Sequence, residues 1–160
     1  MDEEAKAIVA AIEAAFAKMK PGPLTLQQAA KAKYVPTEQL EGWYAMPSKR
    51  HWTELVDQEI EDCGKALYGA DLKSWLGFVP AWMRWSLRHF KHNDSFVSDQ
   101  IIYALDPKTH RGRFEYFTLD QQRAISLFLA YMANSDTWAD ADVAQRALDQ
   151  YWSRHAPADE

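Results

Sequence analysis

An aromatic and basic segment, FVPAWMRWSLRHF at residues 78–90, holds the strongest candidates for binding chemistry in the chain. If this segment is helical, Arg84 and Arg88 share one face, because residues four apart lie one above the other. Guanidinium groups bind carboxylates in a bidentate manner, and Arg and Trp are over-represented at binding hot spots. The two arginines are therefore a candidate contact for an acidic partner or a carboxylate ligand. The alternative is a core helix whose outer face is basic and solvated.

The aromatic residues of the same segment are the second candidate site. Trp82, Trp85 and His89 could line an aromatic pocket between helices, which would suit an enzyme or a small-molecule binder. Core packing explains most of these rings equally well, because a buried Trp removes a large apolar area from water.

Metal and catalytic motifs are weak in this sequence. His89 and His92 have the spacing of two ligands on one helix face, but a zinc site requires at least one further ligand. Nothing in the spacing of Cys63, of His110 or of the acids at 59, 61 and 62 points to convergence on that pair. The chain has no G-x-S-x-G elbow, phosphate-binding loop or dinucleotide fingerprint. We therefore assign no metal ligand, no cofactor and no catalytic residue.

Three acids, Glu54, Asp57 and Glu61, follow each other at steps of three and four residues, so one helix would place them on one face. Paired carboxylates can perform acid–base chemistry if burial raises the pKa of one of them. An acidic face turned to solvent is the commoner arrangement, and it could meet the Arg84 and Arg88 row of another copy. Rings at Trp43 and Tyr44, if exposed, would add to a binding surface.

The elements that position these residues are expected to be helices. Apolar residues recur every three or four positions in several segments, including 8–19, 48–68 and 119–132. Thr25 with Gln28, and Thr118 with Gln121, have the spacing of capping boxes. Pro80 is expected in the first turn of a helix that ends near residue 92. Residues 113–117 are the best candidate for a short extended segment.

These patterns predict an all-α fold, a compact single-domain bundle of about six to eight short helices. The domain is expected to span residues 1–155, with a frayed tail at 156–160. The 160 residues are 48% hydrophobic and 26% charged, as in ordinary soluble globular proteins.

The net charge, the single cysteine and the N-terminal residues indicate which partners and which cellular compartment to expect. A net charge of −5 argues against binding to nucleic acid, which requires clustered basic residues. The lone Cys63 fits a reducing compartment. No apolar run approaches the roughly 20 residues that span a membrane, and the chain begins with acids where a secretory signal would be basic. We expect a cytoplasmic protein without a membrane partner.

Four landmarks together resemble a known family: LTLQQA at 24–29, WYAMP at 43–47, LGFVPAWMRWSL at 76–87 and FTLDQQRAISLFLAYM at 117–132. The pattern is similar to a bacterial family catalogued as domain of unknown function 6714. The chain reads FTLDQQ where that family has Leu-Thr-x-x-Gln, so the order of Thr and Leu differs. The resemblance implies a small stand-alone bacterial protein and transfers no activity.

The leading functional hypothesis is a non-enzymatic protein that binds another protein. A toxin-neutralising protein of the immunity type would be one instance. The alternative is an enzyme or small-molecule binder that uses the aromatic and histidine pocket, and a homodimer is a third reading.

Overall fold

Ten α-helices and four short 3-10 helices make up the described part of the chain, which contains no strand. The computed structural model describes residues 1–48, 50–89, 91, 96–135 and 139–155. His92 and the predicted tail at 156–160 lie outside these ranges. The prediction of an all-α fold is confirmed.

The helices are α1 (Glu3–Phe16), α2 (Leu26–Lys31), η1 (Ala32–Tyr34), α3 (Thr37–Ala45), η2 (Trp52–Glu54), α4 (Asp57–Asp62), α5 (Ala66–Gly69), α6 (Leu72–His89), α7 (Val97–Ala104), α8 (Pro107–His110), η3 (Arg111–Tyr116), α9 (Leu119–Ala133), α10 (Ala141–Gln150) and η4 (Trp152–His155).

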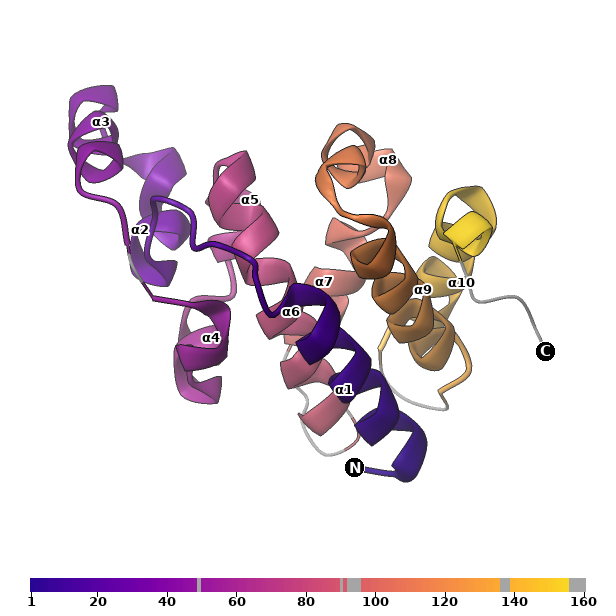
Figure 1. Ribbon diagram of the computed structural model, residues 1–160. Coiled ribbons are helices and arrows are strands. Elements are labelled where there is room, and N and C mark those ends of the chain that lie inside the picture. Colours follow the sequence, from indigo (N-terminus) through magenta and orange to yellow (C-terminus); the bar gives the residue numbers. More distant parts are fainter. Residues whose placement is uncertain (49, 90, 92–95, 136–138, 156–160) are drawn as a thin grey trace.

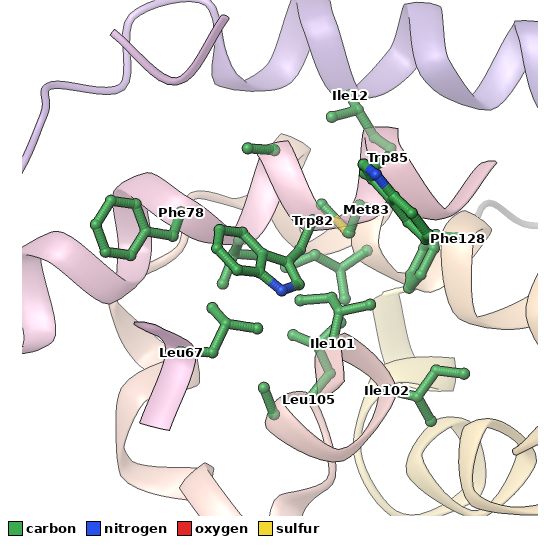
Figure 2. Packing of buried hydrophobic residues seen from close by; sticks show 14 of the residues in the cluster. Ile12, Leu67, Phe78, Trp82, Met83, Trp85, Ile101, Ile102, Leu105 and Phe128 are labelled. Carbon is green, nitrogen blue, oxygen red and sulfur yellow. The ribbon is translucent and has the colours of Figure 1, made fainter. Parts of the chain in front are cut away.

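Helix α6 occupies the centre of the molecule (Figure 1). It packs against α1, α4, α5 and α7, and every residue from Gly77 to Leu87 is buried. A helix that is apolar on most of its circumference is stable only when other elements cover it on all sides. Figure 2 shows Trp82, Met83 and Trp85 of α6 among side chains from α1, α5, α7 and α9. The aromatic richness of this segment therefore builds the core.

The predicted start of this helix at Pro80 is wrong, because Pro80 lies inside α6. The helix begins eight residues earlier, after Asp71. The Asp71 carboxylate accepts hydrogen bonds from the backbone amides of Lys73 at 3.1 Å and Ser74 at 3.4 Å. This cap supports a helix start at Leu72. Proline removes one backbone donor from the helix interior, and the packing around α6 compensates for that loss.

The predicted helix at 48–68 is also wrong, since the structure divides it into η2, α4 and α5. Two carboxylates start new turns within the segment. Glu54 accepts a hydrogen bond from the amide of His51 at 2.6 Å, and Glu59 accepts one from Val56 at 3.1 Å. Each bond satisfies an amide at the start of a turn and so favours a break in the helix there.

The extended conformation expected at 113–117 is not formed, because residues 111–116 are the 3-10 helix η3. Phe114 anchors this segment in the core, where its ring lies 4.7 Å from that of Trp152 and 6.4 Å from that of Trp75. Burial of the Phe114 ring determines the conformation of this segment, which the sequence pattern alone could not predict.

An arm formed by α2, η1 and α3 projects from one end of the molecule (Figure 1). Helix α2 is attached through α5, where Gly69 packs so closely that a β-carbon would lie 2.0 Å from the carbonyl oxygen of Ala29. Helix α3 lies furthest out in the view of Figure 1 and contains no fully buried residue.

Candidate functional site

The Arg84 guanidinium is buried, so the expectation of one solvated row of arginines is wrong for this residue. Arg84 is 7% exposed and its guanidinium lies 4.8 Å from the centre of the Trp52 ring. It donates hydrogen bonds of 3.4 Å to the carbonyl oxygens of Thr53 and Leu55. Burial, followed by the charge of Arg88, lowers the pKa of Arg84. Arg84 therefore fastens the segment at 52–55 to α6.

Arg88 lies on the exposed side of α6, one turn after Arg84. It has no hydrogen bond or ion pair to the other described residues, so its charge is available at the surface. Next to it, His89 forms a 2.6 Å contact between its Nε2 atom and a carboxylate oxygen of Asp57. Both of these side chains are about one-third exposed, at 36% and 37%.

The rings of Trp82 and Trp85 belong to the core, with exposures of 0% and 1%. Each indole N–H donates to a polar side chain at 3.2 Å: Trp82 to Gln100 of α7, and Trp85 to Glu61 of α4. The Trp85 and His89 rings lie 5.0 Å apart. These tryptophans fill space between helices, and they do not line the cleft described below.

The structure thus brings four of the predicted residues together at the junction of α4 and α6. They are Asp57, Glu61, Trp85 and His89, which we call the α4–α6 cluster. Glu54 is separate, because its side chain turns back to the amide of His51. The expectation that the three acids share one helix face fails, since Glu54 belongs to η2 and the other two to α4.

The chemistry that the α4–α6 cluster supports is structural. Its carboxylates accept hydrogen bonds from an indole and an imidazole, which ties α4 to α6. Within the described residues no three His, Cys, Asp or Glu side chains lie close enough to hold a metal ion. Cys63 is buried at the end of α4, and burial raises the pKa of its thiol, which disfavours the nucleophilic thiolate.

A second candidate site is a surface on α3. Leu40, Trp43 and Tyr44 lie at positions i, i+3 and i+4, so they share one face of the helix. Leu40 and Trp43 are partly buried, Tyr44 is 38% exposed, and Met46 after the helix is 82% exposed. We call these four residues the α3 surface. Met46 was missed from the sequence, although WYAMP already places it directly after the two rings.

A cleft lies at another place, between the segment after α1, the start of α2, the residues around η2 and the first half of α6. None of the residues predicted as a site lines it. Pro21 and Gly22, in the segment between α1 and α2, form part of its wall. Its other walls come from segments far apart in the sequence, so no motif could reveal it.

The fold and these surfaces define a class: an all-α protein built on a buried central helix, with one helix held at the edge. The chain belongs to a family of unknown function, DUF6714, whose family model matches residues 4–156. The resemblance carried by the motifs at 24–132 is thereby confirmed and extends over most of the chain. Comparisons with curated proteins and with solved structures found no match. No helix in the described ranges has the length and apolar character that crossing a membrane requires.

Proposed function

We propose that this chain is a non-enzymatic protein that binds another protein through the α3 surface. One observation carries the proposal: α3 has no fully buried residue, and while Leu40 and Trp43 pack in part against the core, Tyr44 and Met46 beside them are exposed. A short helix with so little of its own surface covered gains stability when a partner covers it. Tryptophan, tyrosine and methionine are enriched at protein interfaces.

The charges on α3 indicate the chemistry of the partner. Glu38 and Glu41 are exposed on the same helix, whereas Lys31 and Lys33 lie on the preceding α2 and η1. A partner with an apolar groove and a basic rim complements α3. Two copies of this chain, each with a net charge of −5, repel each other, which favours a different protein over a homodimer.

A toxin-neutralising role of the immunity type is one form of this function. An acidic binding helix would suit a basic toxin. The single, buried Cys63 supports a reducing location such as the cytoplasm.

The experiment is capture of the tagged protein from its native cell extract, followed by binding measurements with each purified partner. The test variant Trp43→Ala/Met46→Ala removes two members of the α3 surface. The matched control is Tyr116→Ala/Leu119→Ala, which removes two side chains that are 62% and 51% exposed elsewhere on the molecule. We expect a stoichiometric complex that the α3 variant weakens at least tenfold, roughly the loss of one hot-spot residue, while the control binds normally.

Three results would contradict the proposal. One is a partner that binds wild type, α3 variant and control equally. Another is a partner that is lost with Arg88→Glu while the α3 variant binds, which would move the interface to the α4–α6 side. The third is self-association through α3, detected as a doubled mass by light scattering.

A further inference from the structure

Helix α3 receives little support from the rest of the molecule. Only Leu40 and Trp43 of its residues are partly buried, and the others are exposed. Among the described residues, no side chain of α3 forms a hydrogen bond or an ion pair. In Figure 1 the helix lies at the outer end of the arm. Helices shorter than about 12 residues are marginal in water unless packing stabilises them, and α3 has 9 residues.

The two ends of α3 are weakly capped. Pro36 precedes the helix and provides no side-chain hydrogen bond to its first amides. The last turn contains no basic residue that would interact favourably with the helix dipole. Helix α2 of the same arm has both features, since Thr25 and Gln28 form a capping box and Lys31 lies in its last turn. Helix α3 therefore lacks the terminal contacts that stabilise its neighbour.

Gly42 weakens the interior of α3. It is exposed, and a β-carbon at this position would meet no atom within 4 Å. Close packing therefore does not require a glycine here. Relative to alanine, a glycine in a helix interior lowers the equilibrium constant for helix formation roughly two- to fivefold. Gly42 thus keeps α3 less stable than the space around it demands.

The chain on both sides of α3 is fixed. Before the helix, Gly69 of α5 packs directly against the backbone of Ala29 in α2. After it, the amide of Ser48 donates a hydrogen bond of 3.0 Å to the carbonyl oxygen of Pro23. Residues 37–46 thus lie between two anchored points and can leave the helical conformation while the rest of the fold remains. Segments with few buried apolar contacts and exposed backbone hydrogen bonds are those that open locally.

We propose that α3 is a locally unfolding helix. In the free chain, residues 37–46 exchange between the helix and an open form while the core stays folded, and Gly42 sets the balance between the two forms. A partner that binds only the closed helix must shift this balance, so its apparent affinity falls in proportion to the closed fraction. This consequence rests on the proposed function, whereas the opening is a property of the free chain.

Hydrogen exchange of the ¹⁵N-labelled full-length protein, without any partner, measures the opening. Helix α2 is the internal control, because it belongs to the same arm and is shorter than α3, with 6 residues. We expect the hydrogen-bonded amides of α3 to be protected at least about tenfold less than those of α2, since Leu26 and Ala29 of α2 are buried. Equal protection of the two helices, or greater protection of α3, overturns the proposal.

Gly42→Ala tests the role of the glycine, and Gly112→Ala is its matched control. Gly112 belongs to η3, and an added β-carbon there also meets no atom within 4 Å. We expect Gly42→Ala to raise the protection of the α3 amides roughly two- to fivefold and to leave α2 unchanged, while Gly112→Ala leaves α3 at its wild-type protection. Equal protection of α3 in the two variants contradicts the role of Gly42.

Gly42→Pro tests whether α3 opens on its own, because proline removes a backbone donor and disrupts a helix interior. We expect this variant to lose the protection of the α3 amides and to keep that of α2 and α6. Its melting temperature should stay within about 2 °C of wild type, since little buried surface is lost. Loss of α2 protection, or a larger fall in melting temperature, shows that α3 unfolds together with the core and overturns the proposal.

The local opening and the proposed function fail in different experiments. A partner that binds away from the α3 surface contradicts the proposed function and does not alter the exchange rates of the free chain. Strong protection of α3 in the free chain overturns the local opening, and a partner can still bind the α3 surface as a rigid helix.

Discussion

An indole face and two backbone carbonyl groups enclose the guanidinium of Arg84, and this contact holds the segment at 52–55 against α6. A buried charge is costly unless its hydrogen bonds and its electrostatic partners are retained. The described residues place no carboxylate in an ion pair with Arg84, so the Trp52 ring and the carbonyl oxygens of Thr53 and Leu55 supply the compensation. Lysine could not replace it, because an ammonium group lacks the planar fork that stacks on a ring.

At this scale we predict opposite outcomes for two neighbouring arginines. Arg84→Glu should lower the free energy of unfolding by about 3–5 kcal/mol, because it places a carboxylate beside two carbonyl oxygens. Arg88→Glu should change it by no more than about 0.5 kcal/mol, since that side chain is exposed. Urea denaturation of the two single variants measures both values. A similar loss in both would show that the assigned burial of α6 is incorrect.

The sequence could place Arg84 and Arg88 on one helical row, but it could not show which part of that row is covered. Spacing fixes the relative direction of side chains on one helix, whereas burial depends on what packs against it. The segment around Trp52 covers the first arginine and leaves the second exposed. The capping boxes at Thr25 and Thr118 were predicted correctly because their contacts lie within three residues.

At the scale of elements, the two ends of the arm respond differently to the same substitution. In Gly69→Ala the new β-carbon meets the carbonyl oxygen of Ala29, so α2 and α5 must move apart. In Gly42→Ala, within α3, the new β-carbon meets no atom within 4 Å. Alanine is also the better helix former of the two.

We predict that Gly69→Ala lowers the free energy of unfolding by about 1–3 kcal/mol, the usual cost of overpacking. Gly42→Ala should stabilise α3 by about 0.4–1 kcal/mol. Chemical denaturation measures the first change, and hydrogen exchange of the α3 amides measures the second. Faster exchange in Gly42→Ala would contradict the helical environment assigned to that residue.

The helix type was predictable for most elements, whereas their boundaries were not. The apolar period of residues 48–68 is that of one helix, yet Glu54 and Glu59 each start a new turn there. A carboxylate that caps a turn and one that lies on a solvated face look alike in the sequence. Both caps span three residues, and the contact between Trp52 and Arg84 holds the segment that contains the first of them.

At the scale of the whole molecule, Asp2 joins α1, α9 and Lys91, which follows α6. Its carboxylate accepts hydrogen bonds from the amide of Ala5 at 2.8 Å, from Lys91 at 2.8 Å and from the Tyr131 hydroxyl at 2.7 Å. These contacts connect the start of α1 with the residues after α6 and with α9. The bonds from Lys91, Ala5 and Tyr131 hold the pKa of Asp2 well below its usual range.

This lowered pKa predicts how stability depends on pH. Because the folded chain binds the proton less tightly than the unfolded chain, the stabilisation is present above about pH 4 and is lost as pH falls toward the folded pKa. Asp2→Asn should therefore lower the melting temperature at neutral pH, and its difference from wild type should shrink below about pH 4. Glu4→Gln, which removes one negative charge two residues away in the first turn of α1, is the control and should change little. A difference that stays constant from pH 7 to pH 2 would contradict a role for the Asp2 charge.

The cleft could not be predicted from the sequence. Its walls come from residues 19–26, 48–55 and 77–78, which approach each other only in the folded chain. The resemblance to the family was carried by core and capping residues, and it indicated a fold without indicating a site.

The burial of α6 on all sides has a consequence for how the chain is made. During synthesis α6 leaves the ribosome before α7 and α9, the elements that Figure 2 shows around Trp82 and Trp85. Its apolar faces stay partly uncovered until α7 and α9 have been translated, and exposed surface of this kind is what chaperones recognise. The N-terminal α1 must also wait for α9, against which it packs. The central helix therefore ties completion of the fold to the synthesis of α9.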